Sequence, residues 1–409
     1  MYETLALLAA FVFLYSISSG GLERTLFSGA IVFAAFGFIF GPLGLDYLVL
    51  DIEGEGLRIL AEMTLALILF IDAASANLDV LKQHIRIPRN LLLIALPLII
   101  LFGFGVGVLI FGGLTLIEIA ILATILAPTD AALGKAVVTN KAVPAKIREG
   151  LSFESGLNDG ICVPILFIFL ALASKSGIEG DTTMHALTLV AEEIGIGVAV
   201  GVGLVVLGSW LLKQFSNRGW ITETWKQLPV IALAVSCFTV AQYIGGSGFI
   251  ACFVGGLLFG WIAKNHKHKL LFAAEGGADT LALITWVVFG AAVVGHTIDK
   301  LTWEPLLYAV LSLTVIRMIP VFLVLLGTQL RTDEKLFIGW FGPRGLATIV
   351  FAVIVVNENL PGGDTIALTA VCTIVLSVVF HGISANPFVA ALASRIGRSE
   401  GISTGDNKD

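Results

Sequence analysis

Residues 125–160, ILAPTDAALGKAVVTNKAVPAKIREGLSFESGLNDG, place three carboxylates in sequence that is otherwise largely apolar. They are Asp130, Glu154 and Asp159, and a short basic turn separates the first from the other two. A charged side chain inside a bilayer is energetically costly, so one that persists there usually handles an ion or a proton. The stretch therefore predicts an ion transporter.

The composition of the whole chain indicates a membrane protein. Of the 409 residues, 57% are hydrophobic and only 13% are charged, and the mean hydropathy is +0.96. A soluble protein could not bury that much apolar surface. The predicted fold class is therefore an all-α polytopic membrane protein with thirteen transmembrane helices of about 20 residues each. The predicted spans are 3–19, 25–44, 57–77, 90–112, 114–139, 149–173, 186–212, 227–244, 248–264, 272–295, 303–327, 334–357 and 364–392.

The Lys and Arg residues orient these spans. With the N-terminus extracytoplasmic, only Arg58, Lys175 and Lys300 fall in outer loops, two arginines fall within spans, and all other basic residues face the cytoplasm. Cytoplasmic loops of membrane proteins carry such an excess of basic residues. The sequence predicts a multi-pass protein of the cell (inner) membrane with a short cytoplasmic C-terminal tail, residues 395–409.

The buried charges share one depth. At 1.5 Å per residue, Asp130 lies roughly 14 Å from the cytoplasmic end of its predicted span, and Asp159 and Arg344 lie roughly 15 to 17 Å from theirs. These depths are close to the middle of a hydrocarbon core of about 30 Å. Isolated charges would scatter, so the common depth predicts one site.

Two predicted spans are interrupted at this same depth. Residues 127–130 contain Pro128, and residues 342–345 contain Pro343 between two glycines. Proline removes a backbone donor and clashes with the preceding turn, and free backbone groups at membrane depth are tolerated only inside protein or along a cavity. The interrupted spans are the fifth and the twelfth, which run in opposite directions. This pattern predicts inverted repeats with the substrate site between two discontinuous helices.

The predicted sixth span supplies the chemistry. Glu154 and Asn158 are four residues apart and share a helix face, with Asp159 about 100° further round. We expect Glu154 to form a buried ion pair with Arg344, which leaves Asp159 without an obvious partner. An unpaired buried carboxylate can hold either a proton or a metal cation, the minimal chemistry of exchange. Arg317, near mid-depth on the eleventh span, is expected either to bond a helix-end carbonyl or to act in function.

Three motifs in this setting resemble those of a known family. TDAALG (Thr129 to Gly134), ESGLNDG (Glu154 to Gly160) and GPRGLA (Gly342 to Ala347) are similar to motifs of monovalent cation/proton antiporters of the NhaP and NHE-like branch, which have the NhaA/NapA-like antiporter fold. The family often reads TDP, whereas here the proline precedes the motif. By this resemblance the cation and proton site comprises Asp159, Asp130, Thr129, Glu154, Ser155 and Asn158, the transported Na⁺ is held by Asp159, Asp130 and Glu154, and Arg344 is bonded to Glu154.

The resemblance also implies an organisation. Residues 1–394 would form one transmembrane domain, in which a mobile ion-binding core (90–173 and 303–392) moves against a dimerising scaffold (3–77 and 186–295). The implied assembly is a homodimer in a lipid bilayer. Its partners would be monovalent cations and protons, with no nucleic acid and no cofactor beyond the transported Na⁺ and H⁺.

The predicted function is therefore electroneutral 1:1 antiport of Na⁺, or Li⁺ or K⁺, for H⁺. Electroneutrality follows from the resemblance, because Asn158 precedes Asp159 where electrogenic relatives carry a second aspartate. One alternative is a cation channel, since midplane acids also line pores, and another is an organic-anion symporter on a similar broken-helix fold. No phosphate-binding GxxxxGK[ST] loop appears. Ser155 and His381 show no triad-like spacing, so no enzyme is predicted.

Overall fold

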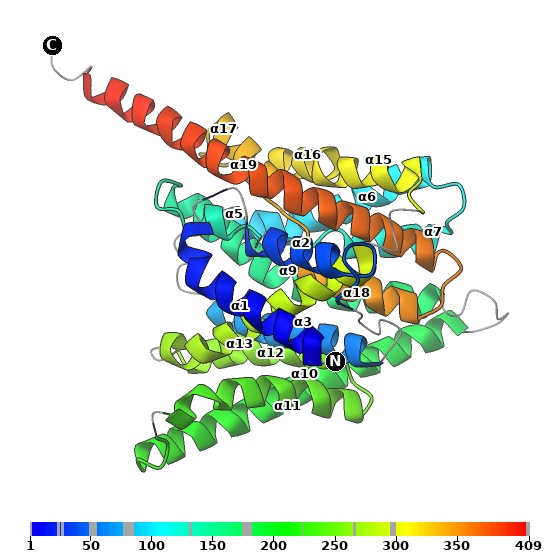
Figure 1. Ribbon diagram of the computed structural model, residues 1–409, viewed down its shortest axis with the longest axis vertical. Coiled ribbons are helices and arrows are strands. Elements are labelled where there is room, and N and C mark those ends of the chain that lie inside the picture. Colours follow the sequence, from blue (N-terminus) through cyan, green and yellow to red (C-terminus); the bar gives the residue numbers. More distant parts are fainter. Residues whose placement is uncertain are drawn as a thin grey trace.

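The computed structural model describes residues 2–22, 25, 28–48, 55–76, 86–130, 133–173, 182–222, 224–264, 267–294 and 300–405, and within them all regular secondary structure is helical (Figure 1). Lys175, residues 131–132 of the TDAALG motif and residues 406–409 of the tail lie outside the described residues. The helices of the first half are α1 (Tyr2–Leu22), α2 (Gly29–Phe40), α3 (Glu55–Ser75), α5 (Arg86–Asn90), the π-helical η1 (Leu91–Ala95), α6 (Leu96–Ile110), α7 (Leu116–Ile125), α8 (Lys135–Val138) and α9 (Ala145–Ala173).

The second half continues the bundle. Its helices are α10 (Thr182–Asn217), the 3₁₀ turn η2 (Thr224–Gln227), α11 (Pro229–Tyr243), α12 (Gly248–Ile262), α13 (Lys267–Val288), the π-helical η3 (Phe289–Val294), α15 (Trp303–Leu313), α16 (Val315–Val324), α17 (Thr332–Trp340), α18 (Leu346–Asn357) and α19 (Gly363–Gly405). Figure 1 places α10 to α13 on one side of the molecule and α15 to α17 with α19 on the other.

Length and composition agree with a polytopic membrane protein. Among the described residues, eight helical stretches are long and apolar enough to cross a membrane, and α2, α7, α12 and α18 are shorter apolar helices. The last helix runs on to Gly405, past the predicted end of its span at residue 392. Bilayer thickness sets the length of the apolar segment, whereas the hydrogen-bond ladder of α19 continues into the polar tail, where no proline follows Pro387.

Both predicted helix breaks are confirmed. The predicted fifth span is interrupted where α7 ends at Ile125, and the chain is non-helical from Ala127 to Asp130. The predicted twelfth span is interrupted where α17 ends at Trp340, and the helix resumes only at Leu346. The two breaks touch, because the Asp130 N–H donates a hydrogen bond of 2.7 Å to the Pro343 carbonyl oxygen.

Two buried carboxylates each connect the first turn of a broken helix to a neighbouring part of the bundle. Glu118, in the first turn of α7, accepts a hydrogen bond of 2.6 Å from the Gly362 N–H just before α19. Glu334, in the first turn of α17, lies 2.9 Å from the Lys146 ammonium of α9. The broken helices are thereby anchored to their neighbours where each one begins.

Close helix packing depends on glycine at particular positions. In α12 a Cβ on Gly256 would collide with the Phe70 carbonyl oxygen of α3, whereas a Cβ on Gly203 of α10 would meet no atom within 4 Å. Helices in lipid use small residues in this way to bring their backbones together. The α3–α12 contact is one of the most extensive in the bundle.

We expect Gly256→Ala to lower the melting temperature in detergent, because overpacking costs about 1 to 3 kcal/mol. Gly203→Ala is the matched control, and it should leave the melting temperature unchanged or slightly raised, since alanine is the better helix former. Equal shifts in the two variants would contradict the packing argument.

Candidate ion-binding site

Asp130 joins the two helix breaks. Its Oδ2 accepts a hydrogen bond of 2.9 Å from the Leu346 N–H, the first amide of α18, and its Oδ1 accepts one of 3.2 Å from the Leu133 N–H. A carboxylate at a helix N-terminus is stabilised by the helix dipole and by the free amides there. A Cβ on Gly345 would occupy the position of this carboxylate, so the glycine is what allows the approach.

Helix α9 holds the first break from the side. The Ser155 hydroxyl donates to the Thr129 carbonyl oxygen, and the Asn158 amide donates to the Thr129 hydroxyl at 2.8 Å. All three side chains are buried. The structure thus brings Thr129, Ser155 and Asn158 together as the sequence predicts, and Thr129 lies in the extended segment despite the displaced proline.

Asp159 is buried, and one of its carboxylate oxygens accepts no hydrogen bond from the described residues. Its side chain is 7% exposed, and its Oδ1 has no hydrogen-bond partner within the described part of the chain. It lines a cavity of ≈ 290 Å³ together with Asp130 and Ser155. A buried polar atom without a partner is rare in proteins and commonly marks a functional position.

Sequence reasoning missed the acids on the opposite wall of this cavity. Asp72 of α3 and Glu275 and Asp279 of α13 line it as well, and Lys135 is the basic residue among its lining side chains. The signal for Asp72 was an aspartate inside a predicted apolar span, close enough to the span's end to be mistaken for an interfacial charge. The cavity is strongly acidic.

The predicted ion pair between Glu154 and Arg344 was wrong, because Glu154 pairs with Arg317. The Arg317 Nη1 and Nη2 donate to the two Glu154 carboxylate oxygens at 2.8 and 3.0 Å, and Nε donates to the Gly339 carbonyl oxygen at 3.2 Å. Both charged side chains are almost completely buried. A bidentate pair of this kind compensates both charges. Arg317 also bonds a carbonyl near a helix end, which is the structural one of the two roles expected for it.

Arg344 instead stabilises the backbone of the breaks. Its Nε donates to the Leu126 carbonyl oxygen at the end of α7, and its Nη1 donates to the Gly342 carbonyl oxygen. A positive charge is favourable at a helix C-terminus, where the free carbonyls make the dipole negative. Its Nη2 has no partner among the described residues. The structure places Arg344 at the crossing, as predicted, with carbonyl groups in place of the expected carboxylate.

These contacts leave Asp159 chemically distinct. Asp130 is held by backbone amides, and Glu154 is fully engaged by Arg317, whereas Asp159 lines the cavity and its buried Oδ1 accepts no hydrogen bond from the described residues. Such an oxygen can receive a proton or a cation. The structure is therefore that of a helical membrane protein with an acidic cavity beside its two helix breaks.

The chain belongs to the sodium/hydrogen exchanger family of transmembrane proteins, whose family model matches residues 7–391. Over 261 residues it is 24% identical to the K⁺/H⁺ antiporter NhaP2 of Shewanella oneidensis, a match that covers 64% of this chain and 45% of that protein. Over 289 residues it is 26% identical to a Na⁺/H⁺ antiporter of Schizosaccharomyces pombe, a match that covers 64% of this chain and 60% of that protein. The matches thus span about half the length of these curated relatives.

A solved structure shares the fold. The sodium proton antiporter MjNhaP1 from Methanocaldococcus jannaschii, at pH 8, superposes with a TM-score of 0.76 at 20% sequence identity. The superposition covers 95% of this chain and 98% of that one. The overall fold is therefore that of a known antiporter structure.

We expect the melting temperatures of Glu154→Gln and Arg317→Gln to fall, because removing one partner of a buried pair costs about 3 to 5 kcal/mol. The double variant should lose less than the sum of the single losses, since neither charge is then left alone. Glu154→Gln with Arg344→Gln is the matched comparison and should be closer to additive. Stronger coupling of Glu154 to Arg344 than to Arg317 would contradict the observed pair.

Proposed function

We propose that the protein is a secondary antiporter that exchanges Na⁺, Li⁺ or K⁺ for H⁺ through Asp159. The observation that carries this function is Asp159 itself, which lines an acidic cavity and whose buried Oδ1 lacks a partner among the described residues. A cation or a proton supplies what this oxygen lacks. Family membership and the antiporter names of the relatives support the same function.

The exchange rests on competition for one carboxylate. Protonated Asp159 cannot bind a metal cation, and cation-bound Asp159 cannot hold a proton, so each ion displaces the other. Thr129, Ser155 and Asn158 support the site, and Asp130 and Asp72 add negative charge beside it. We assign Glu154 to the ion pair rather than to cation coordination, because Arg317 occupies both of its carboxylate oxygens.

The proposed architecture consists of membrane spans divided into a mobile core and a scaffold. Thirteen spans, arranged as inverted repeats with the N-terminus outside and the C-terminus in the cytoplasm, would lie in the inner membrane. The cavity supports a division into core and scaffold, since one wall comes from α9 and α18 and the other from α3 and α13. Movement of one group against the other would alternate access to Asp159. We propose that the scaffold helices also form the homodimer contact.

The alternatives from sequence fit the site less well. An organic-anion symporter needs a site that attracts negative charge, whereas carboxylates outnumber the single lysine on this cavity. A channel would conduct cations without coupling them to protons. Measurement of proton movement on addition of NaCl or KCl to proteoliposomes, with and without a protonophore, separates coupled exchange from conduction.

Asp159→Asn should abolish cation/proton exchange while leaving a folded protein, because the amide has nearly the same shape but cannot take up a proton or balance a cation. Exchange is measured in proteoliposomes with a pH-sensitive dye. Asp364→Asn, at an exposed position in the first turn of α19, is the control and should exchange at the wild-type rate. Wild-type exchange by Asp159→Asn would refute the assignment.

Exchange should also be electroneutral. Asn158 has no charge to change, Glu154 is paired, and Asp130 is held by amides, so only Asp159 alters its occupancy during a cycle. A membrane potential would then do no work on the cycle, although a full unit charge would feel about 2.3 kcal/mol per 100 mV. The measurement clamps the potential with valinomycin and K⁺, after K⁺ has been tested as a substrate. A pH gradient built by Na⁺ exchange under voltage alone would point to Asp72 or Asp130 as a second titrating group.

A further inference from the structure

The break between α17 and α18 removes one particular backbone hydrogen bond. In an uninterrupted helix the Arg344 N–H would donate to the Trp340 carbonyl oxygen, four residues earlier. In the structure two side chains of α19 bond to these two groups, and the Trp340 carbonyl oxygen also accepts the Gly342 N–H at 2.8 Å. The Arg344 N–H donates to the Ser377 hydroxyl at 2.7 Å, and His381 Nε2 lies 2.8 Å from the Trp340 carbonyl oxygen.

Ser377 and His381 are also connected to each other. They are one turn apart on α19, and the Ser377 Oγ lies 3.3 Å from His381 Nδ1. Because Nε2 faces a carbonyl oxygen, it must carry the hydrogen. Nδ1 can then accept from the Ser377 hydroxyl in the neutral ring, or donate to the Ser377 carbonyl oxygen 2.9 Å away in the protonated ring. In both forms the imidazole Nε2–H donates to the Trp340 carbonyl oxygen.

We propose that Ser377 and His381 are positioning residues that bridge the second helix break, a two-side-chain link in place of the lost Arg344–Trp340 bond. Both side chains are buried, so water does not compete for these groups. The link fixes the residues on either side of the intervening segment 341–343. That segment carries the Pro343 carbonyl oxygen that receives the Asp130 N–H. The link therefore acts on the ion site through Asp130, without touching the ion.

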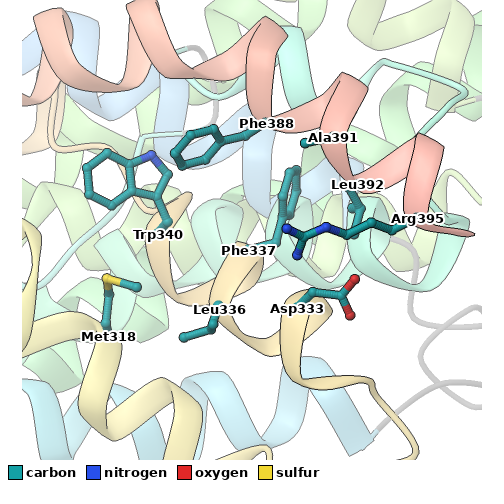
Figure 2. A pocket seen from close by; sticks show the side chains of 9 residues that line it. All are labelled: Met318, Asp333, Leu336, Phe337, Trp340, Phe388, Ala391, Leu392 and Arg395. Carbon is teal, nitrogen blue, oxygen red and sulfur yellow. The ribbon is translucent and has the colours of Figure 1, made fainter.

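Packing alone does not hold this end of α17. Figure 2 shows Trp340 on the wall of an apolar pocket of ≈ 460 Å³, between Met318 of α16 and Phe388 of α19. The indole Nε1 donates to the Ser384 hydroxyl at 2.8 Å, so α19 also holds the side chain of Trp340. The pocket leaves this face of α17 incompletely packed, so polar contacts from α19 add to the ring contacts that Trp340 makes with His381 and Phe388.

The test combines a structural and a functional measurement on the full-length protein. In Ser377→Ala and His381→Leu, backbone amides of residues 341–346 should exchange with deuterium roughly tenfold faster, the factor expected for loss of one hydrogen bond. His381→Gln should retain slow exchange, because an amide both donates and accepts. Thr373→Val is the control, since the buried Thr373 hydroxyl bonds only to its own helix at Thr369.

Transport provides the second measurement, and this part rests on the proposed antiport function. Ser377→Ala and His381→Leu should raise the apparent KM for Na⁺ roughly tenfold at constant pH, while His381→Gln and Thr373→Val stay near wild type. The double variant should be no worse than His381→Leu alone, because both residues form one link.

Two outcomes would overturn the link. Unchanged amide exchange at residues 341–346 in both Ser377→Ala and His381→Leu would show that the link does not hold the break. Equal effects in Thr373→Val would show a general loss of packing in α19. Failure of the wild-type protein to exchange Na⁺ for H⁺ would count against the proposed function alone, because the deuterium measurement does not depend on transport.

Discussion

The crossing of the two helix breaks is the constraint on which the site depends. A bilayer offers no water to an unpaired backbone group, so each break must find its partners inside the protein. Asp130 joins the two breaks, through its N–H to Pro343 and its carboxylate to Leu346, and Arg344 bonds the carbonyl oxygen of Leu126 at the end of α7. Neither break could be satisfied without the other, and Asp159 lies beside the place where they meet.

Charge compensation in this core is selective. Arg317 neutralises Glu154, and Arg344 neutralises helix-end carbonyls. Removing a charge from water is expensive unless it is paired, so the two arginines are accounted for by groups other than Asp159. The result is one carboxylate, Asp159, with an oxygen that no described residue compensates, which is the basis of the proposed function. A second arginine–carboxylate pair at this position would have made the core more self-sufficient and the site inert.

The sequence predicts the breaks and the acids but not the pairing. Pro128 and Pro343 leave a direct signature, and helix rise gives the depth of Asp130 and Asp159. Depth does not say which way a side chain faces around the helix axis, so it could not distinguish Arg317 from Arg344 as the partner of Glu154.

Other features left weaker signals. Asp72 lies five residues from the end of its predicted span, where a single acid is common at a membrane interface. Ser377 and His381 have the spacing of side chains that share a helix face, but both bond to backbone atoms of another segment. Such contacts leave no complementary side chain in the sequence, so only the structure shows what these two residues hold.

The apolar part of the cavity wall has a consequence for leakage. Leu65, Ile68 and Ile71 of α3 line the same cavity as Asp159. An ionised, vacant Asp159 that moved along this surface would be a bare charge against hydrocarbon, which is costly, whereas a protonated or cation-bound Asp159 is neutral overall. In the proposed exchange, these three side chains would permit movement of the neutral, ion-bound Asp159 and would oppose movement of the ionised, vacant Asp159. Under the proposed function, movement of the empty site would dissipate both gradients, and these hydrophobic side chains would oppose it.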